Sequence, residues 1–597
     1  MKLSALYAND ADVFPPILFA NGFNVVFAQV REPKRSTLDS HNLGKTFLAS
    51  VLNFALLADL DGDHPFKALP ETFGHFVFFL EVHTNSGRFI TIRRPVTGRA
   101  AISIHVGANG GDDLRESSDE FWTYRNLSLH KAREILDADL NLDAISPYDF
   151  RKGIGYFLRK QSDYAEIFRI TKFARGKDRD WKPFMAKLLG FDGDLVERKY
   201  GLDTTLDELK RQKQLFESEA EFRSAEYDEI RGLIDLRARA LEKLNSEASS
   251  LDFGAVDARV SSDTVSQLER EIASMNERRY VLEYETSEIE VAGESSIGFD
   301  LERVNRVFAE AGVEFPNQLA RTYEDLIAFN RSLSAERSQR LRARLREIQA
   351  ELTRLNLSLA ELNQNRDRAL TLLKSSSMLE KLRLLQSQIV GAERELAELR
   401  AKQTVLNRAA DVQGRITESE ADLGRIVEEI RKQIRTENRT FDEIRRTFSE
   451  FVEEVLSVQA LLSVEVNDWG NLEFRVRTLD FARAKRETHE AAGMSYQKIL
   501  CACFDLALLT VHQDEGFYRF AYHDGIFEGL DNRKKRNLVG LLRRVCTDFQ
   551  IQHILTVIDS DLPRDEADAK LFFTQEEIVR ELHDRGDDGR LFRMAKF

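Results

Sequence analysis

The sequence is poor in the residues that disulfide-bonded, secreted or membrane proteins need. Only Cys501, Cys503 and Cys546 occur among 597 residues, which excludes a disulfide framework and fits a reducing cytoplasm. No run of about 18 uncharged apolar residues is present, so we expect no membrane-spanning helix. The first residues, MKLSALYANDADVFPP, lack the apolar core and the cleavage site of a signal peptide. We therefore predict a cytoplasmic protein without membrane contact.

Proline is scarce as well, with 10 residues, whereas 31% of the chain is charged. This combination favours long, solvated helices over disorder. The formal net charge of −14 excludes a chain that is basic throughout, so any contact with nucleic acid would depend on local basic runs. The Cys-x-Cys pair lies in an apolar helical stretch without nearby histidine. We interpret it as core packing, because zinc sites normally bring paired ligands at wider spacing.

Residues 203–458 carry a heptad pattern, which is the clearest physical signal in the sequence. Apolar residues alternate in steps of four and three, a stripe that is buried only when the helix pairs with another helix. The pattern therefore predicts a coiled coil. It runs through Val265, Leu268, Ile272, Met275, Leu282 and Ile289; through Leu341, Leu345, Ile348, Leu352, Leu355, Leu359 and Leu362; and through Leu382, Leu385, Ile389, Ala392, Leu396, Leu399 and Leu406.

Break signals interrupt the heptads between the outgoing and the returning segments. Gly293, Gly298, Gly312 and Pro316 fall in this stretch, and such residues let a chain reverse direction. We predict an antiparallel coiled-coil hairpin over 201–458 with its tip near 293–330. The flanking parts, 1–200 and 459–597, are then the N-terminal and C-terminal halves of a globular domain.

Both flanking parts have the pattern of an α/β fold. In the first, FNVVFAQV is typical of a buried strand, and a hairpin turns at Asn85-Ser86-Gly87. In the second, a hairpin about 467–470 is followed by a helix over 495–512, a strand over 517–524, a helix over 533–549 and a strand over 551–559. Helices alternating with apolar strands predict a parallel sheet.

The stretch LDSHNLGKTFLASVLNF has the parts of a phosphate-binding loop. A strand precedes it, a helix follows, and Asn42, Gly44, Lys45 and Thr46 stand at the turn. A lysine for the phosphates, a hydroxyl for Mg²⁺ and the dipole of a helix N-terminus are what such a loop supplies. The first glycine of the usual loop is replaced by Asp39, which is costlier than glycine in a left-handed conformation.

The C-terminal part offers the complementary groups. Asp524 ends an apolar strand in FYRFAYHDGIFEGLD, where a second carboxylate for Mg²⁺ is expected. Gly493 and Ser495 stand at the start of a helix, whose N-terminus could hold a γ-phosphate. The order of phosphate loop, heptad hairpin and carboxylate strand predicts that the coiled coil folds back and joins two half-domains.

This layout resembles the ABC-type ATPases of the SMC and RecN kind over nearly the whole chain. It is most similar to an uncharacterised prokaryotic SMC-like group with C-terminal patterns like HDGIFEGLDNRKKRNL and LHDRGDDGRLFRM. Some members of that wider group are ATPase components of multi-gene anti-phage or anti-plasmid defence systems. The resemblance implies an ABC-type head, built from both halves and interrupted by the coiled coil.

The resemblance also implies how the site works. Two heads of a homodimer would sandwich two ATP molecules, with Lys45 and Thr46 on one face and the partner's Ser495 segment on the other. Thr46 and Asp524 would hold Mg²⁺, and Gln161 would match the glutamine that senses the metal and water. The cycle would act on or sense DNA without sequence preference and control a partner effector, a nuclease for example.

The sequence departs from the family pattern at the catalytic positions. The glutamate expected after Asp524 is Gly525, and Asp559-Ser560-Asp561 replaces the switch histidine. That glutamate serves as a general base, a role worth roughly 100- to 10,000-fold in rate. Glu528, His523 or Asp559 are the candidate replacements, and Glu528 joins Asp524 in our predicted catalytic set. We expect ATP binding with slow hydrolysis.

Other interpretations remain open. Asp559 and Asp561 could hold metal for an intrinsic nuclease, although the remaining chain is short for one. The basic runs RRPVTGR, KFARGKDRDWKPF and NRKKRN are either solvated surface or a groove for DNA phosphates. The protein could also serve DNA repair or chromosome maintenance, or be a coiled-coil scaffold that no longer hydrolyses ATP.

Overall fold

The computed structural model describes most of the chain, and its residues form two compact units. The first, here the globular unit, combines Met1–Thr205 with Ser419–Phe597, and the second, the helical unit, is Leu206–Glu418. Among the described residues no helix is long and apolar enough to cross a membrane. The described residues are 1–29, 43–60, 64–98, 101–170, 176–220, 227–251, 256–294, 317–371, 377–480, 486–487, 494–563 and 572–595.

A five-stranded parallel sheet lies at the centre of the globular unit. Its strand order is β14-β3-β13-β12-β8, and every neighbouring pair is parallel. The predicted parallel sheet is therefore confirmed. Strands buried on both faces read as continuous apolar runs, which is why FNVVFAQ and QHILTVI form its middle. The strands are β3 (Phe23–Gln29), β8 (Leu158–Arg159), β12 (Phe520–Asp524), β13 (Gln552–Ile558) and β14 (Ile578–His583).

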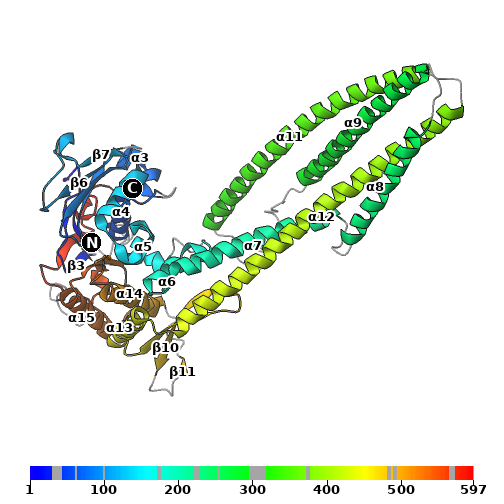
Figure 1. Cartoon of the computed structure of the whole chain (residues 1–597). Coiled ribbons are helices and arrows are strands. Elements are labelled where there is room, and N and C mark those ends of the chain that lie inside the picture. Colours follow the sequence, from blue (N-terminus) through cyan, green and yellow to red (C-terminus); the bar gives the residue numbers. More distant parts are fainter. Residues whose placement is uncertain are drawn as a thin grey trace. The chain divides into compact units, whose positions relative to one another are not determined.

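This sheet joins the two ends of the sequence. β3 and β8 come from the N-terminal part, whereas β12, β13 and β14 come from the C-terminal part, and blue and red segments meet in the globular unit of Figure 1. Val25 and Leu555 are register partners across the boundary between the two parts. The two ends of the chain therefore build one domain, as the sequence predicts.

A second sheet of six antiparallel strands has the order β2-β1-β4-β5-β6-β7. Its β4–β5 hairpin turns at the predicted residues, with Gly87 at a φ of 80°. Helix α1 (Lys45–Ala55) contacts strands of both sheets, so it lies between them. The strands are β1 (Lys2–Ala8), β2 (Ile17–Leu18), β4 (Val77–His83), β5 (Phe89–Pro95), β6 (Ile102–Gly107) and β7 (Tyr124–Leu127).

The predicted hairpin about 467–470 is also present. It joins β9 (Gln459–Val466) to β10 (Leu472–Asp480), and β11 (Arg486–Glu487) completes a three-stranded sheet. The remaining helices that lie wholly or partly in the globular unit are α2 (Pro65–Ala68), α3 (Pro70–Phe73), α4 (Leu129–Leu140), α5 (Phe150–Phe157), α6 (Lys182–Leu188), α7 (Gly193–Ala220), α12 (Ser377–Arg435), α13 (Arg439–Leu456), α14 (Met494–Val511) and α15 (Asn532–Asp548).

The globular unit extends further back along the sequence than the predicted boundary at 459. On the C-terminal side it begins at Ser419 and includes α13, which the predicted boundary places in the coiled coil. The apolar face of α13, including Phe448 and Val452, is buried in the main hydrophobic core. A strongly amphipathic helix can bury its face against a globular core as well as against another helix.

The helical unit contains α8 (Tyr227–Ser249), α9 (Val256–Glu294), α11 (Asn317–Thr371) and most of α12 (Ser377–Arg435). Helices α9 and α11 run side by side in Figure 1. Their ion pairs are Arg366–Glu269, Arg278–Glu351 and Arg344–Glu285. The position on α11 falls as the position on α9 rises, so the two helices are antiparallel, as predicted.

The heptad positions form the interior of this unit. Val265, Leu282 and Ile348 are fully buried, and the described members of the three heptad series are buried or half-buried. The helical unit is more than a pair of helices, because α9 also lies against α8 and α12. A cavity between these helices is lined by Leu241, Tyr280 and Val390, among others. Most of the predicted tip, 293–330, lies outside the described residues.

Candidate functional site

The candidate site begins where the chain enters α1. Gly44 is the N-cap residue of this helix, with a φ of 94° and no side-chain cap on the first turn. This left-handed conformation favours glycine. A Cβ at this position would also lie 2.7 Å from the Cβ of Leu591. The positive end of the α1 dipole therefore lies where the predicted loop ends. Asp39 and Asn42 lie outside the described residues.

A hydrogen bond joins α1 to the end of β12. The Thr46 hydroxyl donates to Oδ2 of Asp524 at 2.7 Å, although 478 positions separate the two residues. The Thr556 hydroxyl donates to the other oxygen, Oδ1. β13, which carries Thr556, lies between β3 and β12, and parallel strands end at a common edge. Asp524 is thus fixed on both oxygens at that edge.

Lys45 lies at this edge as well. Burial lowers the pKa of Lys45, while the carboxylates of Asp524 and Asp561 and two further acidic groups oppose that shift. The Tyr522 hydroxyl donates to the backbone carbonyl of Lys45 at 3.1 Å, so β12 anchors the first residue of α1. A partly desolvated ammonium group at a helix N-terminus is well suited to an anionic ligand.

Gln161 and Glu528 meet beside Asp524. Gln161 opens a short 3-10 helix (Gln161–Tyr164) just after β8, and its Nε2 donates to Oε1 of Glu528 at 2.8 Å. Lys498, on α14, donates to Oε2 of Glu528 at 2.6 Å and to the Gly525 carbonyl at 2.8 Å. The structure therefore places both predicted residues at the edge of the sheet, together with a lysine that we had not predicted.

Gly525 is required by this arrangement. Its φ is +64°, and a Cβ there would lie 2.5 Å from Nε2 of Gln161. A glutamate at this position would be strained and would displace Gln161. The departure from the family pattern is thus matched by the surrounding structure.

Ser495 lies in the first turn of α14, as predicted. Its hydroxyl lies against the turn after β12, where a Cβ on Gly529 would be 2.2 Å from Oγ. Gly529 has a φ of +76°. Gly493 lies outside the described residues. A role for Ser495 toward a partner's nucleotide stays a prediction.

The aspartates after β13 face the same edge. They form the 3-10 helix Asp559–Asp561. Burial, with a smaller contribution from Glu528, raises the pKa of Asp561, whereas Lys535, Lys45 and Lys498 oppose the shift. In the described part of the chain, no group of three or more His, Cys, Asp or Glu side chains is arranged to hold a metal ion. The three cysteines are buried, as expected for core packing.

Several residues of the basic runs are buried or paired within the protein, which limits their contact with DNA phosphates. Arg94 is buried and donates to the carbonyls of Phe54 and Ala58. Lys182 is buried and pairs with Glu473 at 2.9 Å. Lys535 is buried as well, whereas Arg179 is about half exposed, at 51%. Of the described residues of these runs, Arg94, Lys182 and Lys535 therefore stabilise the fold.

The sequence does not predict three of the residues at this edge: Thr556, Lys498 and Tyr522. Each acts through a contact across the fold, and none stands in a recognisable motif. Strand alternation offered the only signal, because Tyr522 and Asp524 share one face of β12. The hydroxyl of Thr46 and the carboxylate of Asp524 together offer two adjacent oxygen donors, the ligand type that Mg²⁺ prefers.

Comparison with known proteins adds a family match for the C-terminal quarter. Residues 451–596 match the model of a family described as "Uncharacterised protein conserved in bacteria (DUF2326)". No curated protein matches the chain.

Solved structures of Smc heads match at low similarity. One is the Smc head domain with a coiled coil and joint from Pyrococcus yayanosii, at 16% identity and a TM-score of 0.34, covering 93% of this chain and 92% of that one. Another is the Smc head domain with an extended coiled coil bound to the C-terminal domain of ScpA, from Pyrococcus furiosus. It has 12% identity and a TM-score of 0.34, covering 94% and 90%.

Proposed function

We propose that this chain is an SMC-like, ABC-type ATPase that binds ATP with Mg²⁺ and hydrolyses it slowly. The observation that carries the proposal is the contact between Thr46 and Asp524 at 2.7 Å, beside Lys45 at the start of α1. A phosphate loop, its hydroxyl and a strand carboxylate are the shared parts of such sites. Here they come from opposite ends of the sequence and meet at one edge of a parallel sheet.

Each residue has a defined task in this proposal. The N-terminus of α1 directs its dipole at the phosphate oxygens, and Lys45 neutralises the β- and γ-phosphates. Thr46 and Asp524 hold Mg²⁺, which when bound neutralises charge on the phosphate oxygens. Gln161 positions the attacking water. Glu528, held by Gln161 and Lys498, accepts the proton of that water in place of the residue missing at Gly525.

The assembly we propose is a homodimer. Two globular units sandwich two ATP molecules, each held by Lys45 of one chain and the Ser495 segment of the other. Closure of this dimer acts on or senses DNA without sequence preference and controls a partner effector, in a prokaryotic anti-phage or anti-plasmid defence system. DNA repair or chromosome maintenance is the alternative setting. The exposed cations, Arg179 among them, support DNA contact only in part.

A hydrolysis-deficient scaffold is the second candidate, and Gly525 favours it. The backbone there leaves no space for the usual glutamate, and the carboxylate of Glu528 is already bound by Lys498. Such a protein would still bind ATP and dimerise.

Lys45→Ala tests nucleotide binding. We expect loss of ATP binding and of ATP-dependent dimerisation, measured by equilibrium dialysis and by light scattering with and without Mg·ATP. If Lys45→Ala binds ATP, dimerises and responds to DNA like the wild type, the ATPase proposal is wrong.

Glu528→Gln separates the enzyme from the scaffold. In the enzyme, hydrolysis falls about 100-fold or more, as for loss of a general base, while ATP binding is retained. Asp524→Ala should weaken Mg·ATP binding itself. Wild-type turnover in Glu528→Gln would remove Glu528 from the catalytic set, and no turnover in the wild type would favour the scaffold.

A further inference from the structure

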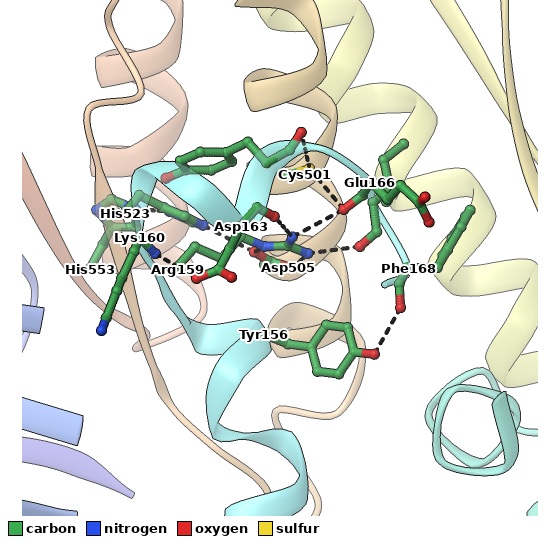
Figure 2. Close-up of polar contacts among 12 residues, drawn as sticks. Tyr156, Arg159, Lys160, Asp163, Glu166, Phe168, Cys501, Asp505, His523 and His553 are labelled. Carbon is green, nitrogen blue, oxygen red and sulfur yellow. Dashed lines mark hydrogen bonds and ion pairs between the residues drawn. The ribbon is translucent and has the colours of Figure 1, made fainter. Parts of the chain in front are cut away.

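A buried polar network lies on the other face of the sheet from Asp524. Its centre is Asp505, on α14, which is fully buried together with Arg159. Arg159 donates from Nε to Oδ2 of Asp505 at 2.6 Å and from Nη2 to Oδ1 at 2.9 Å. Nε2 of His523 lies 3.1 Å from Oδ2 of Asp505. Figure 2 shows these side chains converging from a helix and from the strand region.

The hydrogen-bond chain continues to β13. Nδ1 of His523 lies 2.8 Å from Nε2 of His553. Burial, and then the neighbouring His523, lowers the pKa of His553 well below its ordinary value, so this ring is neutral. The consistent arrangement has His553 donating to His523, and His523 donating to Asp505. Three elements are thereby fixed relative to α14.

Each connection of Asp505 leads to a residue next to the nucleotide site. His523 directly precedes Asp524 on β12, and successive side chains of a strand point to opposite faces. His523 therefore faces α14, while Asp524 faces α1. Arg159 stands two positions before Gln161.

Arg159 also holds the backbone of the segment that carries Gln161. It donates to the carbonyl of Asp163 at 2.8 Å and to that of Ile167 at 2.8 Å. These bonds close the segment after β8 around one guanidinium group, as Figure 2 shows. Because Gln161 lies between Arg159 and Asp163, its position depends on this clamp.

The same face of α14 reaches the other side of Asp524. Lys498 and Asp505 are seven residues apart, two turns of helix, so they share a face. Lys498 binds the Gly525 carbonyl at 2.8 Å, and Asp505 binds the His523 ring. One helix face thus holds the residues immediately before and after Asp524.

We propose that Asp505 is a positioning residue of the nucleotide site, acting through Arg159 on Gln161 and through His523 on Asp524. A buried ion pair alone is weak evidence for a stabilising role, since well-packed apolar side chains often replace one without loss. Here all partners converge on the two residues assigned to water and metal. The inference rests on the proposed ATPase function for its catalytic consequence.

The test compares His523→Leu with His523→Gln and with a matched control. Leucine removes both hydrogen bonds of the ring but leaves Asp505 paired with Arg159, so no charge is orphaned. Glutamine retains an N–H donor toward Asp505. The control is His512→Leu. His512 is also buried and directly follows α14, and its ring contacts the carbonyl of Leu188 and the carboxylate of Glu515.

Hydrogen exchange of the nucleotide-free proteins reads the positioning directly. We expect His523→Leu to speed exchange in peptides covering 522–530, whereas His512→Leu leaves those peptides unchanged. Equal exchange in the two leucine variants would overturn the proposal. This readout needs no nucleotide, so it holds even if the wild type neither binds nor hydrolyses ATP, an outcome that would refute the proposed function alone.

Steady-state kinetics give the second readout. For His523→Leu we expect kcat for ATP to fall about 10-fold or more, the size of effect known for residues that orient metal ligands, with KM within about 2-fold. His523→Gln should recover most of the rate. If kcat is unchanged in His523→Leu, or if His523→Gln is as impaired as His523→Leu, Asp505 does not position the site through His523.

Discussion

The globular and helical units use charged residues in opposite ways. In the globular unit, Arg159 and Asp505 are both fully buried, and polar side chains from distant parts of the sequence converge at one edge of the sheet. In the helical unit, pairs such as Arg278–Glu351 remain 54% and 37% exposed above a continuous apolar seam. The difference indicates that chemistry is concentrated in the globular unit, while ion pairs of the helical unit mainly accompany helix pairing.

The largest effect should come from breaking the buried pair. Arg159→Met leaves the carboxylate of Asp505 without its main partner, which we expect to cost about 3–5 kcal/mol of unfolding free energy. The three tryptophans, Trp122, Trp181 and Trp469, all lie in the globular unit, so their fluorescence in urea reports on that unit.

The matched change in the helical unit is Glu395→Gln. Glu395 pairs with Arg237 at 3.0 Å, and both side chains are about half exposed. We expect a change of about 0–1 kcal/mol, measured by the helical circular dichroism signal in urea. Comparable losses in the two variants would contradict the contrast between the units.

The next effect concerns the seam of the helical unit. Ile348 is fully buried at a heptad position, so Ile348→Ala should cost about 2–5 kcal/mol locally. Leu357, on the same helix, is 68% exposed, and Leu357→Ala should change stability by less than about 0.5 kcal/mol. Circular dichroism melts of the two variants make the comparison. Equal effects would mean that the heptad seam does not hold these helices together.

The smallest effect is a pH dependence inside the helical unit. Burial raises the pKa of Glu393 above its ordinary 4.5, with the nearby Glu277 and Glu269 adding to the shift. Burial also raises the pKa of Glu269, with Arg366 opposing it. A raised folded-state pKa means that the folded form binds protons more tightly. The contribution of these two carboxyl groups to stability is therefore most favourable below the ordinary glutamate pKa, and it is lost as pH rises through their folded-state pKa.

Glu393→Gln should reduce this loss, because the amide stays neutral at every pH. Hydrogen exchange of peptides within 377–400 at pH 5 and pH 8 measures it, with the exposed Glu395→Gln as control. An unchanged pH dependence in Glu393→Gln would show that the carboxylate of Glu393 is not responsible.

The two units also differ in how much their sequence predicts. Heptad spacing depends only on residues three and four positions apart, so Val265, Ile348 and Leu396 could be assigned to the seam directly. The packing of α9 against α12 could not be predicted, because the half-exposed residues of α9 do not specify a second partner helix.

In the globular unit, the strands and helices followed from local apolar patterns, and Lys45, Thr46 and Asp524 followed from a motif and a strand end. Gln161 and Glu528 lie at the same edge and contact each other, although their contact depends on Gly525 having a left-handed conformation. Lys498, Thr556 and the network around Asp505 could not be predicted. Their partners lie up to 346 positions away, as in Arg159–Asp505, and their register depends on the completed fold.

The central claim is that Thr46 and Asp524 form one metal–nucleotide site. The most direct test is a double-mutant cycle of Mg·ATP affinity with Thr46→Val, Asp524→Asn and the combined variant, measured by equilibrium dialysis with and without Mg²⁺. We expect each single variant to weaken Mg²⁺-dependent binding at least about 10-fold and the double variant to be little worse than either. Additive losses, or single variants that bind Mg·ATP like the wild type, would contradict the claim.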